Sequence, residues 1–234
     1  MTDERYYIRT GRMIIITGHY GSGKTEFAVS LAMLLAAEGA GKLALVDLDI
    51  INPFFRSRER RAMLEDAGVP VYGSAFKGDV TAELPALEAG LRAPLEDSDC
   101  RVIIDSGGND SGALVLNQFG KYFKDDETTV LAVVNANRPD TSTLEGALEH
   151  IAAIEAATGL NISGIVNNCH LLRETTAETI IKGHGLCRKV CEATGKMLWC
   201  DCYPEGIVRP EDLSGLSGNL MPLGLYMRPT WLDK

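Results

Sequence analysis

The sequence lacks the features that would tie the protein to a membrane. No apolar run in its 234 residues approaches the ~18 that are needed to span a bilayer. The first residues, MTDERYYIRTGR, lack the apolar core of a secretory signal. The stretch LYMRPTWLDK at the other end lacks the basic amphipathic helix that attaches proteins to lipid surfaces. We therefore expect a cytoplasmic protein without membrane attachment, with reduced cysteines.

Positive charge is also scarce. Lysine and arginine number 23 against 32 aspartates and glutamates, which gives a formal net charge of −9. A general nucleic-acid binder needs a basic face to neutralise phosphates, so this class is excluded. The only dense basic run is RSRERR (56–61), which is either a local patch or the solvated start of a helix.

No internal repeat or low-complexity linker divides the chain, so we expect a single domain over residues 1–234. Hydrophobic residues make up 45% and charged residues 24%, as in a soluble globule with a core. Helical patterns, clearest at 24–39 and 141–159, alternate with short apolar runs. This alternation predicts an α/β fold with a doubly wound, mainly parallel, seven-stranded sheet and helices on both faces. The predicted strands are 12–17, 42–49, 69–73, 100–108, 128–136, 160–168 and 196–204.

One glycine-rich loop joins the first predicted strand to the first helix. The stretch ITGHYGSGKTEFAVSLA (16–32) has Gly18, four residues, and then Gly23-Lys24-Thr25. This is the P-loop pattern G-x-x-x-x-G-K-[ST], whose backbone N–H groups surround phosphates. Lysine in this pattern reaches the β- and γ-phosphates, and the threonine hydroxyl binds Mg²⁺.

Acidic residues end two further strands. Asp105 follows the apolar run VII, as a Walker-B aspartate does, and Gly108 completes a D-x-x-G pattern that can sense a γ-phosphate. In VDLD, Asp47 and Asp49 are two residues apart and point to one side of an extended strand. One could brace the P-loop while the other orients water. A helix cap or a solvated turn is the alternative for this pair.

Together these motifs resemble the CobQ/CobB/MinD/ParA nucleotide-binding superfamily, and the MinD/ParA group in particular. The resemblance extends through Pro204. It implies a Mg²⁺-dependent ATPase in which Lys24 and Asp49 are catalytic and in which Thr25, Asp49 and Asp105 hold the metal. It also implies a nucleotide-dependent homodimer. The loop residues that it assigns to the nucleotide are Gly18, His19, Tyr20, Gly21, Ser22, Gly23, Lys24, Thr25 and Glu26.

The sequence departs from the family at two positions of this loop. His19 stands where the family has a lysine that reaches the partner's phosphates across the dimer, and Tyr20 stands where it has glycine. Histidine is shorter and is charged only part of the time near neutral pH. This departure leaves it open whether His19 replaces the trans-acting lysine.

The base-binding residues are expected near two later strand ends. The GTPase motif N-K-x-D is absent, and NRPD (137–140) only imitates it. The resemblance instead places an adenine-reading asparagine at Asn167, with Asn168 second, although turn chemistry is the alternative. Tyr203, Pro204 and Glu205 begin the loop that covers the base in the family. ATP is therefore favoured over GTP.

Four cysteines suggest a weaker metal hypothesis. Cys187 and Cys191 share a helix face, and Cys200 and Cys202 share a strand face, so the four thiols could converge on Zn²⁺ or a softer metal. The alternative is that they are small hydrophobic core residues. His170 and His184 have no partner spacing and are expected at the surface.

The resulting prediction is an ATPase that acts as a nucleotide switch on an unidentified protein partner, with ATP, ADP and Mg²⁺ as ligands. Metallocofactor maturation is one role that this superfamily suggests. Nucleotide would order or release the segments 49–58 and 106–115. The alternative is a small-molecule phosphotransferase or ATP-dependent ligase resembling dethiobiotin synthetase, in which Arg56, Arg58 and Arg60 close over the phosphates.

Overall fold

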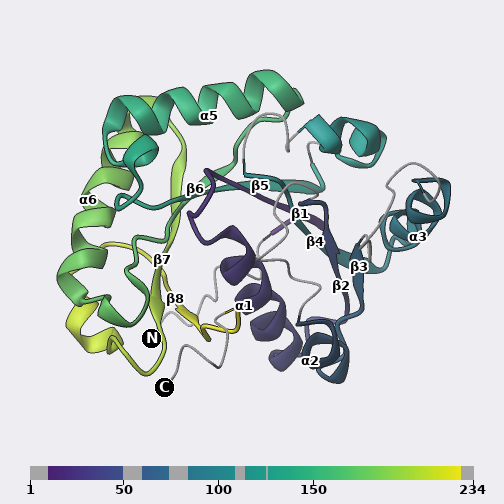
Figure 1. Ribbon diagram of the computed structural model, residues 1–234, viewed down its shortest axis with the longest axis horizontal. Coiled ribbons are helices and arrows are strands. Elements are labelled where there is room, and N and C mark those ends of the chain that lie inside the picture. The colour runs from purple at the N-terminus through teal and green to yellow at the C-terminus, as the bar shows by residue number, and fades with distance from the viewer. Residues whose placement is uncertain (1–9, 50–59, 74–83, 109–113, 125, 228–234) are drawn as a thin grey trace.

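One parallel sheet forms the centre of the molecule. The computed structural model describes residues 10–49, 60–73, 84–108, 114–124 and 126–227. Eight strands pair in the order β3-β2-β4-β1-β5-β6-β7-β8, and every pair is parallel (Figure 1). The strands are β1 (Met13–Thr17), β2 (Lys42–Asp47), β3 (Val71–Gly73), β4 (Cys100–Asp105), β5 (Thr128–Val134), β6 (Gly164–Asn167), β7 (Met197–Pro204) and β8 (Leu220–Leu223).

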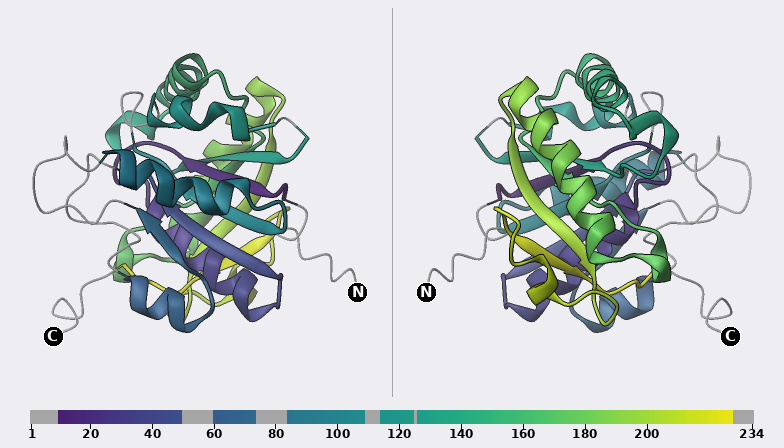
Figure 2. Two further views of the ribbon diagram at one scale, coloured as in Figure 1. Left: turned by 90° about the vertical axis from the view of Figure 1, so that its right-hand side faces the viewer. Right: turned by 90° about the vertical axis from the view of Figure 1, so that its left-hand side faces the viewer.

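Helices cover both faces of this sheet, as the alternation of strand and helix patterns predicted (Figures 1 and 2). The α-helices are α1 (Lys24–Ala37), α2 (Arg61–Asp66), α3 (Leu84–Glu96), α5 (Leu144–Thr158) and α6 (Ala177–Thr194). Short 3₁₀ segments are η3 (Leu114–Tyr122), η4 (Pro139–Thr141), η5 (Leu172–Glu174) and η6 (Pro210–Leu213). One face carries α1 and α2, and the other carries α3, η3, α5 and α6.

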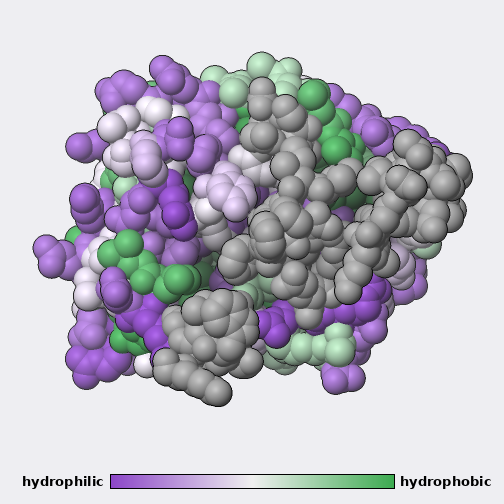
Figure 3. Space-filling model, viewed as in Figure 1, coloured by the Kyte–Doolittle hydropathy of each residue, from purple (hydrophilic) through white to green (hydrophobic). Residues whose placement is uncertain are grey.

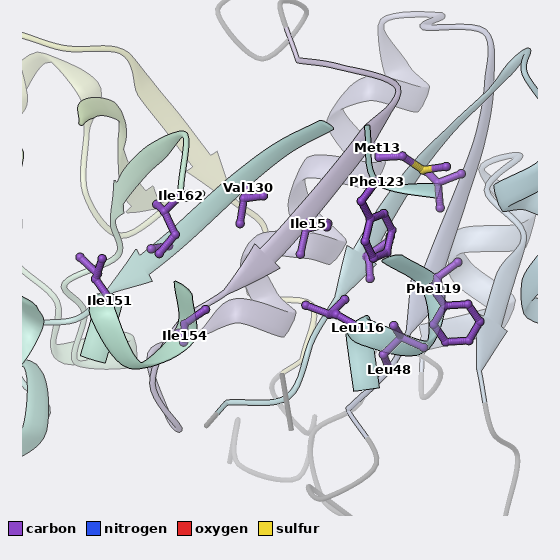
Figure 4. Close-up of a cluster of buried hydrophobic side chains, with 14 of the residues drawn as sticks. Met13, Ile15, Leu48, Leu116, Phe119, Phe123, Val130, Ile151, Ile154 and Ile162 are labelled. Carbon is purple, nitrogen blue, oxygen red and sulfur yellow. The ribbon is translucent and has the colours of Figure 1, made fainter. Parts of the chain in front are cut away.

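The two faces bury separate hydrophobic clusters because side chains alternate along each strand. In β1, Met13 and Ile15 pack toward α5 and η3, in the cluster shown in Figure 4, whereas Ile14 and Ile16 pack toward α1. All four side chains are fully buried. β1, which the sequence predicted as a buried β-branched strand, therefore contributes side chains to both hydrophobic clusters.

The helices that flank the later strands begin and end at recognisable residues. Thr143 accepts a hydrogen bond from the Gly146 N–H at the start of α5, and Thr176 caps α6 in the same way. Gly159 and Gly195 end these helices in the left-handed conformation, with φ of 68° and 71°. These caps fix where the following strands β6 and β7 start.

The sheet has eight strands rather than the seven predicted. The additional strand, β8, is four residues long and contains Pro222. Proline lacks the N–H that a central strand needs, so the sequence argues against a strand there. Because β8 is an edge strand that pairs only with β7 in this sheet, proline is tolerated.

The described surface that Figure 3 shows is mainly polar. On the face shown in Figure 3, hydrophobic residues form separate groups among hydrophilic ones. None of the helices in the described ranges is long and apolar enough to cross a bilayer.

Candidate functional site

The P-loop connects β1 to α1, and three glycines with positive φ shape it. Gly18, Gly21 and Gly23 have φ values of 141°, 74° and 85°. A Cβ at Gly18 would collide with the Val133 carbonyl, and one at Gly23 would collide with the Asn168 amide. No described side chain caps α1. The N–H groups of its first turn therefore remain available to an anion.

Lys24 is buried at the centre of the loop. Its side chain donates to the His19 carbonyl at 3.4 Å. Burial lowers the pKa of Lys24, whereas the charges of Asp105 and Asp49 act in the opposite direction. A Cβ at Gly108 would lie 2.8 Å from the Lys24 Nζ and 3.1 Å from the Tyr20 backbone, so a side chain there would crowd both the lysine and the P-loop. The ammonium is thus enclosed by the P-loop and the segment after β4.

Three aspartates lie beside this lysine. The register of β2 and β4 places Asp47 opposite Asp105 at the carboxyl ends of the strands. Neither Asp105 oxygen has a hydrogen bond of good geometry from the described residues, and the side chain is fully buried. Burial, followed by the charge of Asp47, raises the pKa of Asp105 to about 8, while Lys24 and Thr25 act to lower it.

A divalent cation fits this group of oxygens. Asp105 has two buried acceptor oxygens without good partners, and Thr25 and Asp49 line the adjoining cavity. The Asp49 N–H donates to the Asp47 carboxylate at 3.1 Å, which fixes the chain where it leaves β2. Hard oxygen donors of this kind suit Mg²⁺. A cation here would also remove the electrostatic cost of burying Asp105.

A cavity of about 380 Å³ extends from the P-loop, a size typical of small-ligand sites. Gly21, Gly23, Lys24 and Thr25 form one end of it. The other end is mostly apolar and is built from the ends of β7 and β8 and from the segment after β6. Its described lining includes Leu172, Thr175, Cys202, Pro204, Leu223, Leu225 and Met227.

Glu26 joins the two ends of this cavity. Its carboxylate accepts hydrogen bonds from the N–H groups of Tyr226, at 2.6 Å, and Met227, at 2.8 Å. Ser30, one turn later in α1, accepts from the Gly224 N–H at 3.2 Å. The first turns of α1 therefore hold the segment 224–227, which is the wall beside the apolar end.

The two candidate asparagines have different positions. Asn168 lines the cavity, and its amide donates to the Ser22 carbonyl at 2.8 Å, so it braces the P-loop. Asn167, which was expected to read the base, does not line the cavity. Strand side chains alternate, so Asn167 points to the other side of β6 from its neighbour.

The Asn167 amide is used inside the fold. It donates to the Ile180 carbonyl at 3.0 Å and to the Asp201 carboxylate at 2.6 Å, and it accepts from the Cys169 N–H. The second Asp201 oxygen lies 2.8 Å from the His184 Nδ1. This network joins β6, α6 and β7 on the side of β6 that faces away from the cavity. His184, expected at the surface, is a largely buried member of it.

The loop after β7 contributes less than was expected. Pro204 lines the cavity. Tyr203 instead packs against the small hydrophobic cluster of Ile180, Val208 and Leu213, and Glu205 is exposed. Neither side chain is part of the described cavity lining.

Two basic cavity residues were not assigned to the site from the sequence. His170 was expected at the surface, but it lines the cavity, and burial lowers its pKa to about 4, with a contribution from Arg138. Arg138, in the NRPD segment, reaches the P-loop from the end of β5. Their local patterns carry no signal for this role, because the contacts join residues far apart in sequence.

His19 points back into its own chain. Its Nε2 lies 3.4 Å from an Asp140 oxygen, its Nδ1 lies 2.9 Å from the Tyr20 carbonyl, and its ring meets that of His150 edge-on. Tyr20 lines the cavity and is 60% exposed. In this arrangement the His19 side chain is engaged by the loop after β5 and by α5.

The four-cysteine metal hypothesis is wrong. Cys187 and Cys191 belong to the hydrophobic cluster under α5 and α6, whereas Cys200 and Cys202 belong to the cluster under α1, on the opposite face of the sheet. All six cysteines are free and buried. Among the residues that the structure describes, no three or more histidine, cysteine, aspartate or glutamate side chains are grouped so that they could hold a metal ion. These thiols are core residues.

Some expected elements lie outside the described residues. These are Arg56 and Arg58, and most of the two segments that were expected to respond to nucleotide, at 50–58 and 109–113.

Comparison with known proteins supports the fold class. No model of a known protein family matches the sequence, and no curated protein matches it. Among solved structures, the cell division protein FtsY from Thermotoga maritima matches with a TM-score of 0.53 and 21% identity, over 80% of this chain and 59% of that one. The signal recognition particle 54 kDa protein from Aeropyrum pernix, in complex with GDP, matches with a TM-score of 0.54 and 22% identity.

These matches show a fold and not a family. The second match covers 84% of this chain but 43% of the other, and FtsY from Mycoplasma mycoides gives a TM-score of 0.54 at 15% identity, over 85% and 63%. This chain thus spans between 43% and 63% of the length of these structures. It has the α/β fold of the P-loop NTPases. The matches do not support the narrower MinD/ParA group.

The buried Asp105 predicts an unusual pH dependence. Its pKa rises from 3.8 to about 8 on folding, so the folded state holds a proton that the unfolded state releases. Stability of the metal-free protein should therefore fall as pH rises from about 4 to about 8. The Asp105→Asn variant lacks this loss. Its melting temperature relative to wild type should increase across that range by at least 2–4 °C, roughly the effect of 1 kcal/mol.

Thermal melts in a chelator, without nucleotide, would measure this difference at several pH values. The exposed Asp66→Asn is the matched control, and it should follow wild type throughout. A constant difference between Asp105→Asn and wild type from pH 4 to 9 would contradict the prediction.

The Asn167 network predicts a stability effect without a binding effect. The Asn167→Ala substitution leaves the Asp201 carboxylate with one fewer donor, so unfolding free energy should fall by roughly 1–3 kcal/mol. Nucleotide affinity should change less than about threefold, because the side chain does not line the cavity. Urea denaturation and calorimetric titration measure the two effects. Asn117→Ala, which removes an exposed amide, is the control. Lost affinity with unchanged stability would return Asn167 to the base site.

Proposed function

We propose that the protein is a Mg²⁺-dependent ATPase of the MinD/ParA type that acts as a nucleotide switch on a protein partner. The observation that carries the proposal is the cavity itself. One end has uncapped helix N–H groups, a buried lysine and a carboxylate without good partners, and the other end is apolar. A nucleoside triphosphate with its metal has the complementary sequence of charges and surfaces.

The chain's own residues have distinct roles in this proposal. Lys24 and the P-loop N–H groups bind the β- and γ-phosphates, and Thr25, Asp49 and Asp105 hold the metal. When bound, Mg²⁺ neutralises charge on the phosphate oxygens. Asp49 orients the attacking water, for which the Asp47 hydrogen bond to its N–H fixes the backbone. Gly108 lies against Lys24, where its N–H could respond to the γ-phosphate.

Adenine suits the described base end better than guanine. Guanine presents two donors on one edge, and a site for it needs an acceptor such as a carboxylate. The described lining at this end is mostly apolar, and its polar side chains are Thr175 together with Asn168 and His170 on the segment after β6, none of which is a carboxylate. Glu26 reaches this wall, but its oxygens already accept from the N–H groups of Tyr226 and Met227. This distribution of acceptors supports ATP.

Exposed apolar side chains next to the cavity support the proposed nucleotide switch. Tyr20, Leu171 and Leu172 are each about half exposed or more, and they lie in the P-loop and at the start of η5, at the carboxyl edge of the sheet. Exposed large apolar side chains around a ligand site mark surfaces that bind proteins. We propose that nucleotide controls contact with a protein partner or with a second copy of this chain at this edge.

Two substitutions should separate binding from chemistry. Lys24→Ala should weaken ATP binding and reduce phosphate release by at least about 100-fold, because it removes phosphate charge stabilisation. Asp49→Ala should retain ATP binding within about threefold and lose turnover, since water positioning acts in the transition state. Calorimetry and single-turnover phosphate assays would measure both, with Asp66→Asn as the control. Turnover that requires an added metabolite would instead favour the phosphotransferase or ligase.

Nucleotide preference tests the base assignment. We expect ATP to bind at least about tenfold more tightly than GTP, because one unsatisfied polar edge costs roughly 1–3 kcal/mol. Competition of each nucleotide against a fluorescent ADP derivative would give both affinities. Equal or tighter binding of GTP would refute the adenine assignment while leaving the phosphate site in place.

A further inference from the structure

The loop after β5 is braced and lies beside the P-loop. The Asn135 carbonyl accepts from the Arg138 N–H at 3.1 Å and from the Thr141 hydroxyl at 2.9 Å. The Asn135 side chain accepts from the Asn137 N–H at 3.0 Å, and Pro139 restricts the backbone after Arg138. These contacts hold Arg138 at a defined point of the cavity edge.

Arg138 contacts the P-loop directly. Its Nε donates to the Gly21 carbonyl at 2.8 Å, and its side chain lines the cavity with Lys24 and Thr25. A Cβ at Gly21 would lie 3.0 Å from the guanidinium carbon, so the glycine also makes room for this side chain. No acceptor among the described residues is hydrogen-bonded to the two Nη groups, and no described carboxylate pairs with them.

The other basic groups at this end do not serve the same position. Lys24 is enclosed under the loop, and His19 is turned toward Asp140. His170 is neutral near pH 7, since its pKa is lowered to about 4. Arg138 is therefore the described group that brings a permanent positive charge to the open side of the P-loop.

We propose that Arg138 binds phosphate oxygens of the nucleotide through its Nη groups while its Nε holds the P-loop at Gly21. The inference rests on the proposed nucleotide function and deepens it by assigning a second phosphate-binding cation from the same chain. A guanidinium suits this double role because its five N–H donors lie in one plane and can serve two acceptors at once.

Substitutions at Arg138 can separate charge from bracing. Arg138→Gln keeps one N–H donor for the Gly21 carbonyl and removes the charge, whereas Arg138→Lys keeps the charge. Arg188→Gln removes an exposed arginine of α6 and is the matched control. Calorimetric titration of the full chain with ADP and ATP, together with melting temperatures without ligand, gives affinity and stability for each variant.

We expect Arg138→Gln to lose roughly tenfold or more in affinity for ADP and ATP, with an unchanged melting temperature without ligand. Arg138→Lys should recover part of the affinity, and Arg188→Gln should match wild type. Wild-type affinity in Arg138→Gln would overturn the inference alone. So would equal losses in the Gln and Lys variants with lowered melting temperatures, which would make Arg138 a brace only. A wild-type protein that binds neither nucleotide would overturn the proposed function itself.

Discussion

The structure depends on how one buried lysine and three aspartates are accommodated at the end of a hydrophobic sheet. Taking these charges out of water is costly, and only part of the cost is recovered by their attraction. The rise in the pKa of Asp105 is a direct consequence of that cost. A fold under selection for stability alone would replace these groups with apolar ones. Their presence is explained if a cation and an anion complete the site.

The need to bring these charged groups together determines which strand registers and helix ends must be held in place. Asp105 and Asp47 meet because β2 and β4 pair in one register, and Lys24 is aligned because α1 begins directly after the left-handed Gly23. The same helix, through Glu26, holds the wall at the apolar end. The phosphate end and the far wall of the cavity are therefore connected through the first turns of one helix.

Sequence reasoning succeeded where the information is local and failed where it is not. The P-loop and the acids at the ends of β2 and β4 follow from patterns within a few residues. The doubly wound sheet follows from the alternation of strand and helix patterns along the chain. The strand β8 was missed because Pro222 argues against a strand unless its place at the edge is known. Asn167 was placed at the base site, but it does not line the cavity, whereas its neighbour Asn168 does, because successive side chains of an extended segment point in opposite directions. The place of Arg138 in the cavity and of Cys187 in the core depends on contacts between elements that are far apart in sequence. The spacing of residues along the chain does not encode such contacts.

The contacts of His19 show how neighbouring segments can change the role of a residue within the P-loop motif. A lysine there could extend toward a partner, but His19 is shorter and lies against Asp140 and His150 of its own chain. The segment 137–140 thus contacts the P-loop twice, through Asp140 at His19 and through Arg138 at Gly21. If Arg138 binds the nucleotide as proposed, a positive charge at the outer side of the loop comes from the same chain. A second copy of the chain would then not be needed to supply that charge.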